Sequence, residues 1–148
     1  ASLAVAESCT GGGLGQLLTG VPGSSRYFIG GAIAYDNRVK VSLLGVKEET
    51  LAREGAVSHS VAMEMALGIQ SRLQTTWGVS ITGIAGPEGG TSEKPVGLVY
   101  IGISDENQQA RSFEFNFGSI QGREWVRRLS AHTALDIVRR ELLTALKK

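Results

Sequence analysis

The chain has 148 residues, of which 42% are hydrophobic and 20% are charged. These values are typical of one folded domain with a buried core and exclude an intrinsically disordered chain. The formal net charge is +1, which gives no strong field for nucleic acid. The segment 120–148 carries seven basic and three acidic residues, as expected for the solvated face of a helix.

The composition also limits the compartment and the cofactors. No apolar run reaches the roughly 20 residues needed to cross a bilayer, and we find no export leader. The single cysteine, Cys9, cannot form an internal disulfide. We therefore expect a cytoplasmic protein with no membrane or nucleic-acid partner. Two histidines and one cysteine cannot supply a zinc site of soft ligands. A carboxylate site for magnesium is formally open, but no paired acidic motif supports it, so we expect no metal or other cofactor.

Strands and helices alternate in the first part of the chain. Residues 3–6 are a short apolar run that predicts a buried strand, followed by a tight turn and a helix over 14–18 with Thr10 or a neighbour as its cap. Residues 27–35 predict a strand with a bend or bulge at Gly30 and Gly31. Asp36 or Asn37 then caps a helix that Gly45 stops.

The rest of the chain predicts two helices, three strands and a final helix. A short helix covers 48–54, and a longer one opens at Ser58 and buries Ala62, Met65, Ala66, Ile69 and Leu73 on one face. Residues 77–82 form a strand that runs into a long loop over 83–95, and strands 97–104 and 110–117 form a hairpin. The last helix starts at Arg123, with Val126, Leu129, Ile137 and Leu142 inward. We predict a single domain over 1–148, an α/β fold with three α/β/α layers and a mixed sheet that includes the late antiparallel hairpin.

Glycine is the unusual component, with 20 residues in 148, about double the ordinary usage of ~7%. The glycines cluster at 11–13, 30–31 and 83–90. Clustered glycine between periodic segments is typical of tight turns or of backbone that approaches a ligand closely.

The segment Glu7-Ser-Cys-Thr-Gly-Gly12 places a hydroxyl where a strand ends and a helix begins. Reactive groups of α/β proteins lie at such positions, and the N–H groups of a helix start can hold an anion. The segment fits either a plain turn with a helix cap or a site with Ser8 as nucleophile.

A serine nucleophile needs a base, and neither histidine suits this role. His59 lies on the first turn of one predicted helix and His132 lies inside another, where each is a surface or packing residue. Lys40 follows Tyr35 by five residues, about one turn into a helix, so both can face one cleft. A buried lysine can lose its proton and act as a base; an exposed helical lysine is the alternative.

The segments together form an ordered set of motifs. They are ESCTGG at 7–12, VPGSS at 21–25, GGAIAYDNRVK at 30–40, LLGV at 43–46, GAVS at 55–58, TGIAGPEGGT at 82–91 and KPVG at 94–97. From about Val5 to Leu135 the chain resembles the CinA carboxy-terminal domain family. The resemblance implies an amidase that converts nicotinamide mononucleotide to nicotinic acid mononucleotide and ammonia, in pyridine nucleotide salvage.

The resemblance also implies roles for particular residues. Ser8 matches the nucleophile, Lys40 the base and Tyr35 a supporting residue that hydrogen-bonds the lysine. Arg123 matches a late arginine of the family, although the family's Gly-Asp-Arg reads Gly122-Arg123 here. The substrate-binding residues we expect are Thr10, Gly11, Gly12, Asn37, Gly83, Gly86, Gly89, Gly90 and Arg123. We expect the N–H groups from Thr10 to Gly12 to bind the oxyanion.

The expected partner is a small nucleotide substrate. The family also occurs fused behind a larger amino-terminal domain, and its long glycine-rich loop suggests a homodimer contact. The rival interpretation is a non-catalytic nucleotide-binding module of a competence- or damage-inducible protein. The presence of Ser8, Tyr35 and Lys40 together favours the enzyme.

Overall fold

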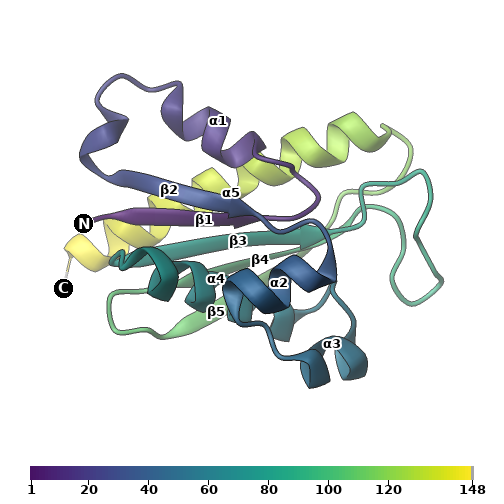
Figure 1. Ribbon diagram of the computed structural model, residues 1–148. Helices are drawn as coiled ribbons and strands as arrows, with labels where there is room; N and C mark the ends of the chain where they lie inside the picture. The colour runs from purple at the N-terminus through teal and green to yellow at the C-terminus, as the bar shows by residue number, and fades with distance from the viewer. Residues whose placement is uncertain (148) are drawn as a thin grey trace.

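The centre of the molecule is a five-stranded mixed sheet in the order β2-β1-β3-β4-β5 (Figure 1). The computed structural model describes residues 1–147. The strands are β1 (Leu3–Glu7), β2 (Phe28–Ile33), β3 (Trp77–Gly83), β4 (Leu98–Ser104) and β5 (Ala110–Asn116). β1 is parallel to β2 and β3, whereas β3, β4 and β5 are antiparallel. The predicted α/β fold with a mixed sheet and a late hairpin is confirmed.

Helices cover both faces of this sheet. They are α1 (Gly13–Thr19), α2 (Asn37–Leu44), α3 (Glu48–Glu54), α4 (His59–Leu73) and α5 (Arg123–Leu146), with a 3₁₀ turn η1 (Ser24–Arg26) before β2. α1 and α5 lie on one face, and α2, α3 and α4 lie on the other (Figure 1). In the described residues, no helix is both long and apolar enough to span a membrane.

Every residue of β1 is buried because the strand lies between these two layers. Its side chains alternate: Leu3 and Val5 join the core under α1 and α5, while Ala4 and Ala6 join the core under α2 and α4. The small side chains on the second face let α4 approach the sheet closely, and α2 packs against α4. β1 therefore ends rigidly, and Ser8 follows directly.

Side-chain caps fix the two helices nearest the site. The Asp36 side chain accepts from the Arg38 N–H at the start of α2, and Gly45 ends this helix with a φ of 70°. Ser58 accepts from the Val61 N–H at the start of α4. The predicted inward face of α4 is confirmed, with four of its residues buried and Leu73 half-buried.

Three local predictions are wrong in detail. β2 ends at Ile33 rather than residue 35, and its pairing with β1 skips Ile29, one residue before the predicted bend. The N-cap of α1 is Gly12, a near neighbour of Thr10, and no side chain caps from this position; the Glu7 carboxylate accepts the N–H groups of Leu14 and Gly15 instead. In α5, Leu129 and Leu142 are only half-buried, because small residues fill the inner face of this helix, among them Ser130, Ala131 and Ala134.

Candidate active site

Ser8 and Lys40 meet at the carboxyl end of β1. Ser8 is the first residue after the strand, and its N–H still donates to the Ile81 carbonyl of β3. Lys40 lies on the first turn of α2, and its Nζ is 3.0 Å from Ser8 Oγ. The two residues are 8% and 1% exposed. The sequence allowed either a buried or an exposed Lys40. The structure has the buried lysine, in contact with a hydroxyl.

Burial shifts the protonation equilibrium of Lys40 toward its neutral form. Nζ also donates to the carbonyls of Ala34 at 2.8 Å and Tyr35 at 3.0 Å. Burial lowers the pKa of Lys40 from its ordinary value, and negative charge at Cys9 or Asp36 opposes this. A neutral amine has two N–H donors and one lone pair. Since carbonyls can only accept, they take the two donors, and the lone pair is left for the Ser8 hydroxyl proton.

The nearby thiol does not supply the opposing charge at neutral pH. Burial raises the pKa of Cys9 to about 11, so the thiol stays protonated. Cys9 is 5% exposed and packs in the core beneath α1 and α5, although it also touches the cavity at Ser8. Ser8 faces Lys40, and Cys9 is largely turned toward the core.

The two neighbouring carboxylates are engaged elsewhere, as expected for a lysine base. Glu7 Oε1 accepts from the Thr10 hydroxyl at 2.6 Å and from the Leu14 N–H at 2.9 Å, and Oε2 accepts from the Gly15 N–H. Asp36 caps α2 and forms an exposed ion pair with Arg38. Neither carboxylate bonds to Nζ of Lys40, so neither directly holds the amine in its charged form.

A cavity of about 260 Å³ opens over Ser8 and Lys40. Eight of the predicted site residues line it: Ser8, Tyr35, Asn37, Lys40, Gly83, Gly86, Gly89 and Arg123. Seven further lining residues were not predicted as site residues: Cys9, Ala56, Val57, Thr82, Ile84, Ala85 and Glu88. Most of the seven lie inside the GAVS and TGIAGPEGGT motifs. Predicting every residue of these motifs as a site residue, and not only the glycines, would have found them.

Four predicted binding residues lie elsewhere. Thr10, Gly11 and Gly12 line a different cavity, between α1 and α5. The chain turns toward that side after Cys9 because Glu7 binds the start of α1 and the Gly11 N–H donates back to the Ser8 carbonyl. Gly90 lies outside the Ser8 cavity; a Cβ there would come 2.7 Å from the Val96 nitrogen, so this glycine permits close backbone packing.

Tyr35 contacts Lys40 differently from the prediction. Its backbone carbonyl, not its phenol, accepts from Nζ. The side chain is 62% exposed, and its hydroxyl accepts from Arg123 Nη2 at 3.3 Å. Arg123 Nη1 donates to the Gly86 carbonyl at 2.8 Å. Arg123 therefore links the start of α5 to the glycine-rich loop and to the segment between β2 and α2.

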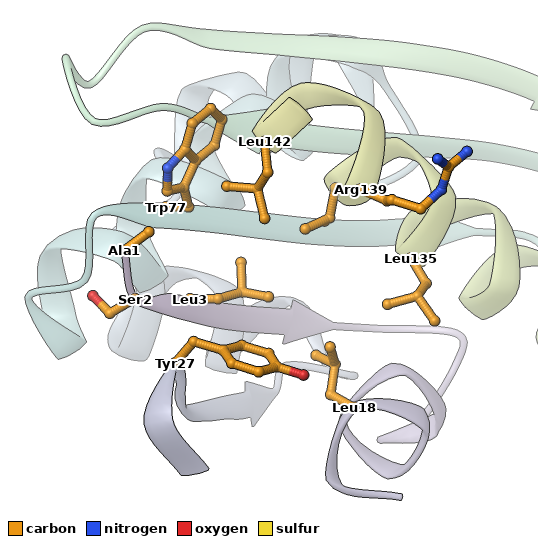
Figure 2. Close-up of a pocket in the computed structure, with 10 residues that line it drawn as sticks. Ala1, Ser2, Leu3, Leu18, Tyr27, Trp77, Leu135, Arg139 and Leu142 are labelled. Carbon is orange, nitrogen blue, oxygen red and sulfur yellow. The ribbon is translucent and has the colours of Figure 1, made fainter. Parts of the chain in front are cut away.

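Another cavity, of about 290 Å³, lies at the opposite end of β1 (Figure 2). Leu3, Leu18, Tyr27, Trp77 and Leu142 line it with mostly carbon atoms (Figure 2). Its one arginine, Arg139, is paired with Asp136. This cavity brings no nucleophile and base together. Within residues 1–147, no group of three or more His, Cys, Asp or Glu residues is placed to hold a metal ion.

The fold and this site define an α/β domain with a buried serine–lysine pair at the end of its central strand. Residues 1–142 match the family described as the CinA C-terminal domain, and the chain belongs to this family.

Relatives agree with this assignment. A CinA-like protein of a Cyanothece species is 64% identical over 143 residues, covering 97% of this chain and 34% of that protein. A CinA-like protein of Synechococcus elongatus is 69% identical over 142 residues, covering 96% of this chain and 34% of that protein. The chain thus spans about a third of the length of the curated relatives it matches.

Solved structures share the fold. The competence/damage inducible protein CihA of Agrobacterium tumefaciens superposes with a TM-score of 0.89 at 41% identity, covering 99% of this chain and 86% of that one. The competence damage-inducible protein A of Klebsiella pneumoniae superposes with a TM-score of 0.90 at 30% identity, covering 96% of this chain and 86% of that one.

Proposed function

We propose that this domain is an amidohydrolase that hydrolyses the carboxamide of nicotinamide mononucleotide, yielding nicotinic acid mononucleotide and ammonia. The observation that carries the proposal is the contact between Lys40 Nζ and Ser8 Oγ, with both side chains buried. A buried lysine beside a hydroxyl is a known way to activate a serine. The choice of substrate rests on the family resemblance of the sequence.

The proton path follows from the three hydrogen bonds of Lys40. The neutral amine takes the Ser8 proton as Oγ attacks the amide carbon. The resulting ammonium stays anchored by the Ala34 and Tyr35 carbonyls and gives its proton to the departing nitrogen, which leaves as ammonia. A water molecule then attacks the acyl-serine ester, with Lys40 again as base, and releases the carboxylate and the free serine.

The oxyanion needs N–H donors, and the turn after β1 limits the choice. The Ser8 N–H donates to Ile81 and the Gly11 N–H donates to the Ser8 carbonyl. The N–H groups at the start of α1 bind Glu7. We assign the oxyanion to the Cys9 N–H, because Cys9 lines the Ser8 cavity while Thr10 and Gly12 line another, and because the residue after the nucleophile commonly supplies this donor. One such donor is worth about 3 kcal/mol of transition-state stabilisation.

The charges of the cavity suit a zwitterionic nucleotide. Its wall holds one guanidinium, Arg123, and one carboxylate, Glu88. Arg123 is oriented by Gly86 and Tyr35 and keeps further N–H donors for a phosphate. Glu88 offers a negative charge to a pyridinium ring. The Asn37 amide, also at the cavity, can bind the ribose hydroxyls or the carboxamide.

Ammonia release by the isolated chain tests the proposal. Nicotinamide mononucleotide, nicotinamide riboside and free nicotinamide are incubated in parallel, with the Ser8→Ala variant as a blank. We expect release from the mononucleotide, less from the riboside, and none from the Ser8→Ala protein. Saturable binding of the mononucleotide without ammonia release would instead identify a non-catalytic nucleotide-binding module.

A further inference from the structure

The cavity between α1 and α5 lies on the other side of the turn that carries Ser8. Its volume is about 670 Å³, within the usual range of small-molecule sites. The turn residues from Thr10 to Gly13 form one wall, and Arg127, Arg128 and His132 of α5 lie on the other. This α1–α5 cavity shares no lining residue with the Ser8 cavity.

One of its two arginines, Arg127, is held in place by hydrogen bonds and an ion pair. Arg127 Nε donates to the Cys9 carbonyl at 3.0 Å, and Nη1 lies 3.6 Å from the Glu124 carboxylate. Gly11 makes room for this side chain, since a Cβ there would come 3.2 Å from Nη2. Among residues 1–147, Glu124 is the only carboxylate lining the α1–α5 cavity, and Arg127 partly neutralises it.

Arg128 differs from the other arginines of α5. Arg139 and Arg140 pair with Asp136, while Arg123 and Arg127 bind backbone carbonyls. Across the described part of the chain, no hydrogen bond or ion pair is formed by the side chain of Arg128 or of His132.

These two side chains are four residues apart on α5, and both are exposed at the cavity. Residues at this spacing lie on the same face of a helix, so their N–H donors can meet one ligand.

The opposite wall leaves space for that ligand. Gly11, Gly12 and Gly13 carry no side chains into the cavity, and its volume exceeds the space that a bare ion fills. A guanidinium with an adjacent imidazole matches the oxygens of a phosphate monoester. We propose that the α1–α5 cavity binds a small phosphate ester, with Arg128 and His132 holding the phosphate and the glycine wall accommodating the organic part.

The two cavities share no lining residue, so binding at the α1–α5 cavity can be tested without an activity assay. Glycerol 3-phosphate is the probe and glycerol is the neutral control, both titrated by calorimetry at constant ionic strength. We expect saturable binding of the phosphate ester only. The double variant Arg128→Gln/His132→Gln should bind at least tenfold more weakly at an unchanged melting temperature, because both side chains are exposed and unpaired within the described residues.

Arg123→Gln is the matched control, because it removes an arginine of the same helix from the other cavity. It should leave the affinity for glycerol 3-phosphate unchanged, and amide shifts on binding should centre on Gly11–Gly13 rather than on Gly83–Gly89. Absence of saturable binding would overturn the proposal. So would equal affinity in the double variant, or a loss confined to Arg123→Gln.

Discussion

Ser8 and Cys9 are adjacent in the chain but have opposite chemical settings. Ser8 Oγ contacts a lysine amine whose pKa is lowered by burial, so its proton has an acceptor. The Cys9 thiol has the higher intrinsic nucleophilicity, but burial raises its pKa to about 11 and keeps it protonated. At the scale of single residues, the structure therefore favours the hydroxyl over the thiol.

Paired substitutions at these two positions test this assignment. We expect Ser8→Ala to lower kcat by about three orders of magnitude or more, since no other activated nucleophile lies at the cavity in residues 1–147. Cys9→Ala should keep most of the activity, with a modest loss of stability from the core. Steady-state ammonia release and thermal melts of both variants provide the measurement. Activity that survives Ser8→Ala and disappears in Cys9→Ala would transfer the nucleophile to the thiol.

At the scale of elements, the position of Lys40 depends on how closely α2 packs against α4. Gly68 of α4 lies under Leu44, the last residue of α2 and one turn after Lys40. A Cβ on Gly68 would come 1.9 Å from the Leu44 carbonyl oxygen, too close for any real contact. Glycine at this position thus lets α2 lie near enough for its lysine to reach the end of β1.

Gly68→Ala should therefore affect both stability and catalysis. We expect it to lower the free energy of unfolding by about 1–3 kcal/mol through overpacking, and to lower kcat because α2, which carries Lys40, must move away from α4. Denaturant melts and ammonia release measure the two effects. Gly13→Ala is the control, because its Cβ would meet its nearest heavy atoms at 3.8 and 4.0 Å; that change should stay within about 0.5 kcal/mol. Equal effects of the two substitutions would contradict this account of the helix contact.

At the scale of the whole molecule, the sequence correctly predicted the features that depend on local sequence signals, such as helix ends and the order of strands and helices. Of the two caps predicted for α2, Asp36 and Asn37, the structure has Asp36, and the predicted stop at Gly45 and start at Ser58 also match the helix ends. The layer arrangement followed from the alternation of strands and helices. The ordered motifs placed Ser8 and Lys40 in one site, although they lie 32 residues apart.

The sequence failed to predict side-chain hydrogen bonds that depend on a distant or competing partner. Thr10 looked like a helix cap, but its hydroxyl donates to Glu7, whose carboxylate also accepts the N–H groups at the start of α1, and Thr10 lines the cavity between α1 and α5 instead of the Ser8 cavity. Tyr35 looked like a support for Lys40 through its phenol. Arg123, 88 residues away, binds that hydroxyl instead. Neither competition leaves a signal in local sequence pattern.

The titration of Lys40 links the site to the stability of the entire fold. Because its pKa is lowered in the folded state, the unfolded chain binds more protons between that lowered value and the ordinary 10.5. Stability from this group is then fully present above 10.5 and is lost as the pH falls through the folded-state value. Lys40→Met should remove this component of the pH dependence of unfolding.

The pH profile of ammonia release from nicotinamide mononucleotide, for the native chain and for Lys40→Arg, tests the role of Lys40 as base most directly. Circular dichroism establishes that the variant is folded, and Lys40→Met serves as a second variant of smaller volume. We expect native activity to rise with pH along a limb whose midpoint lies below the ordinary lysine pKa. Lys40→Arg and Lys40→Met should be inactive, because guanidinium keeps its proton and methionine has none to exchange. Substantial activity in folded Lys40→Arg would contradict the account and reduce Lys40 to an electrostatic support.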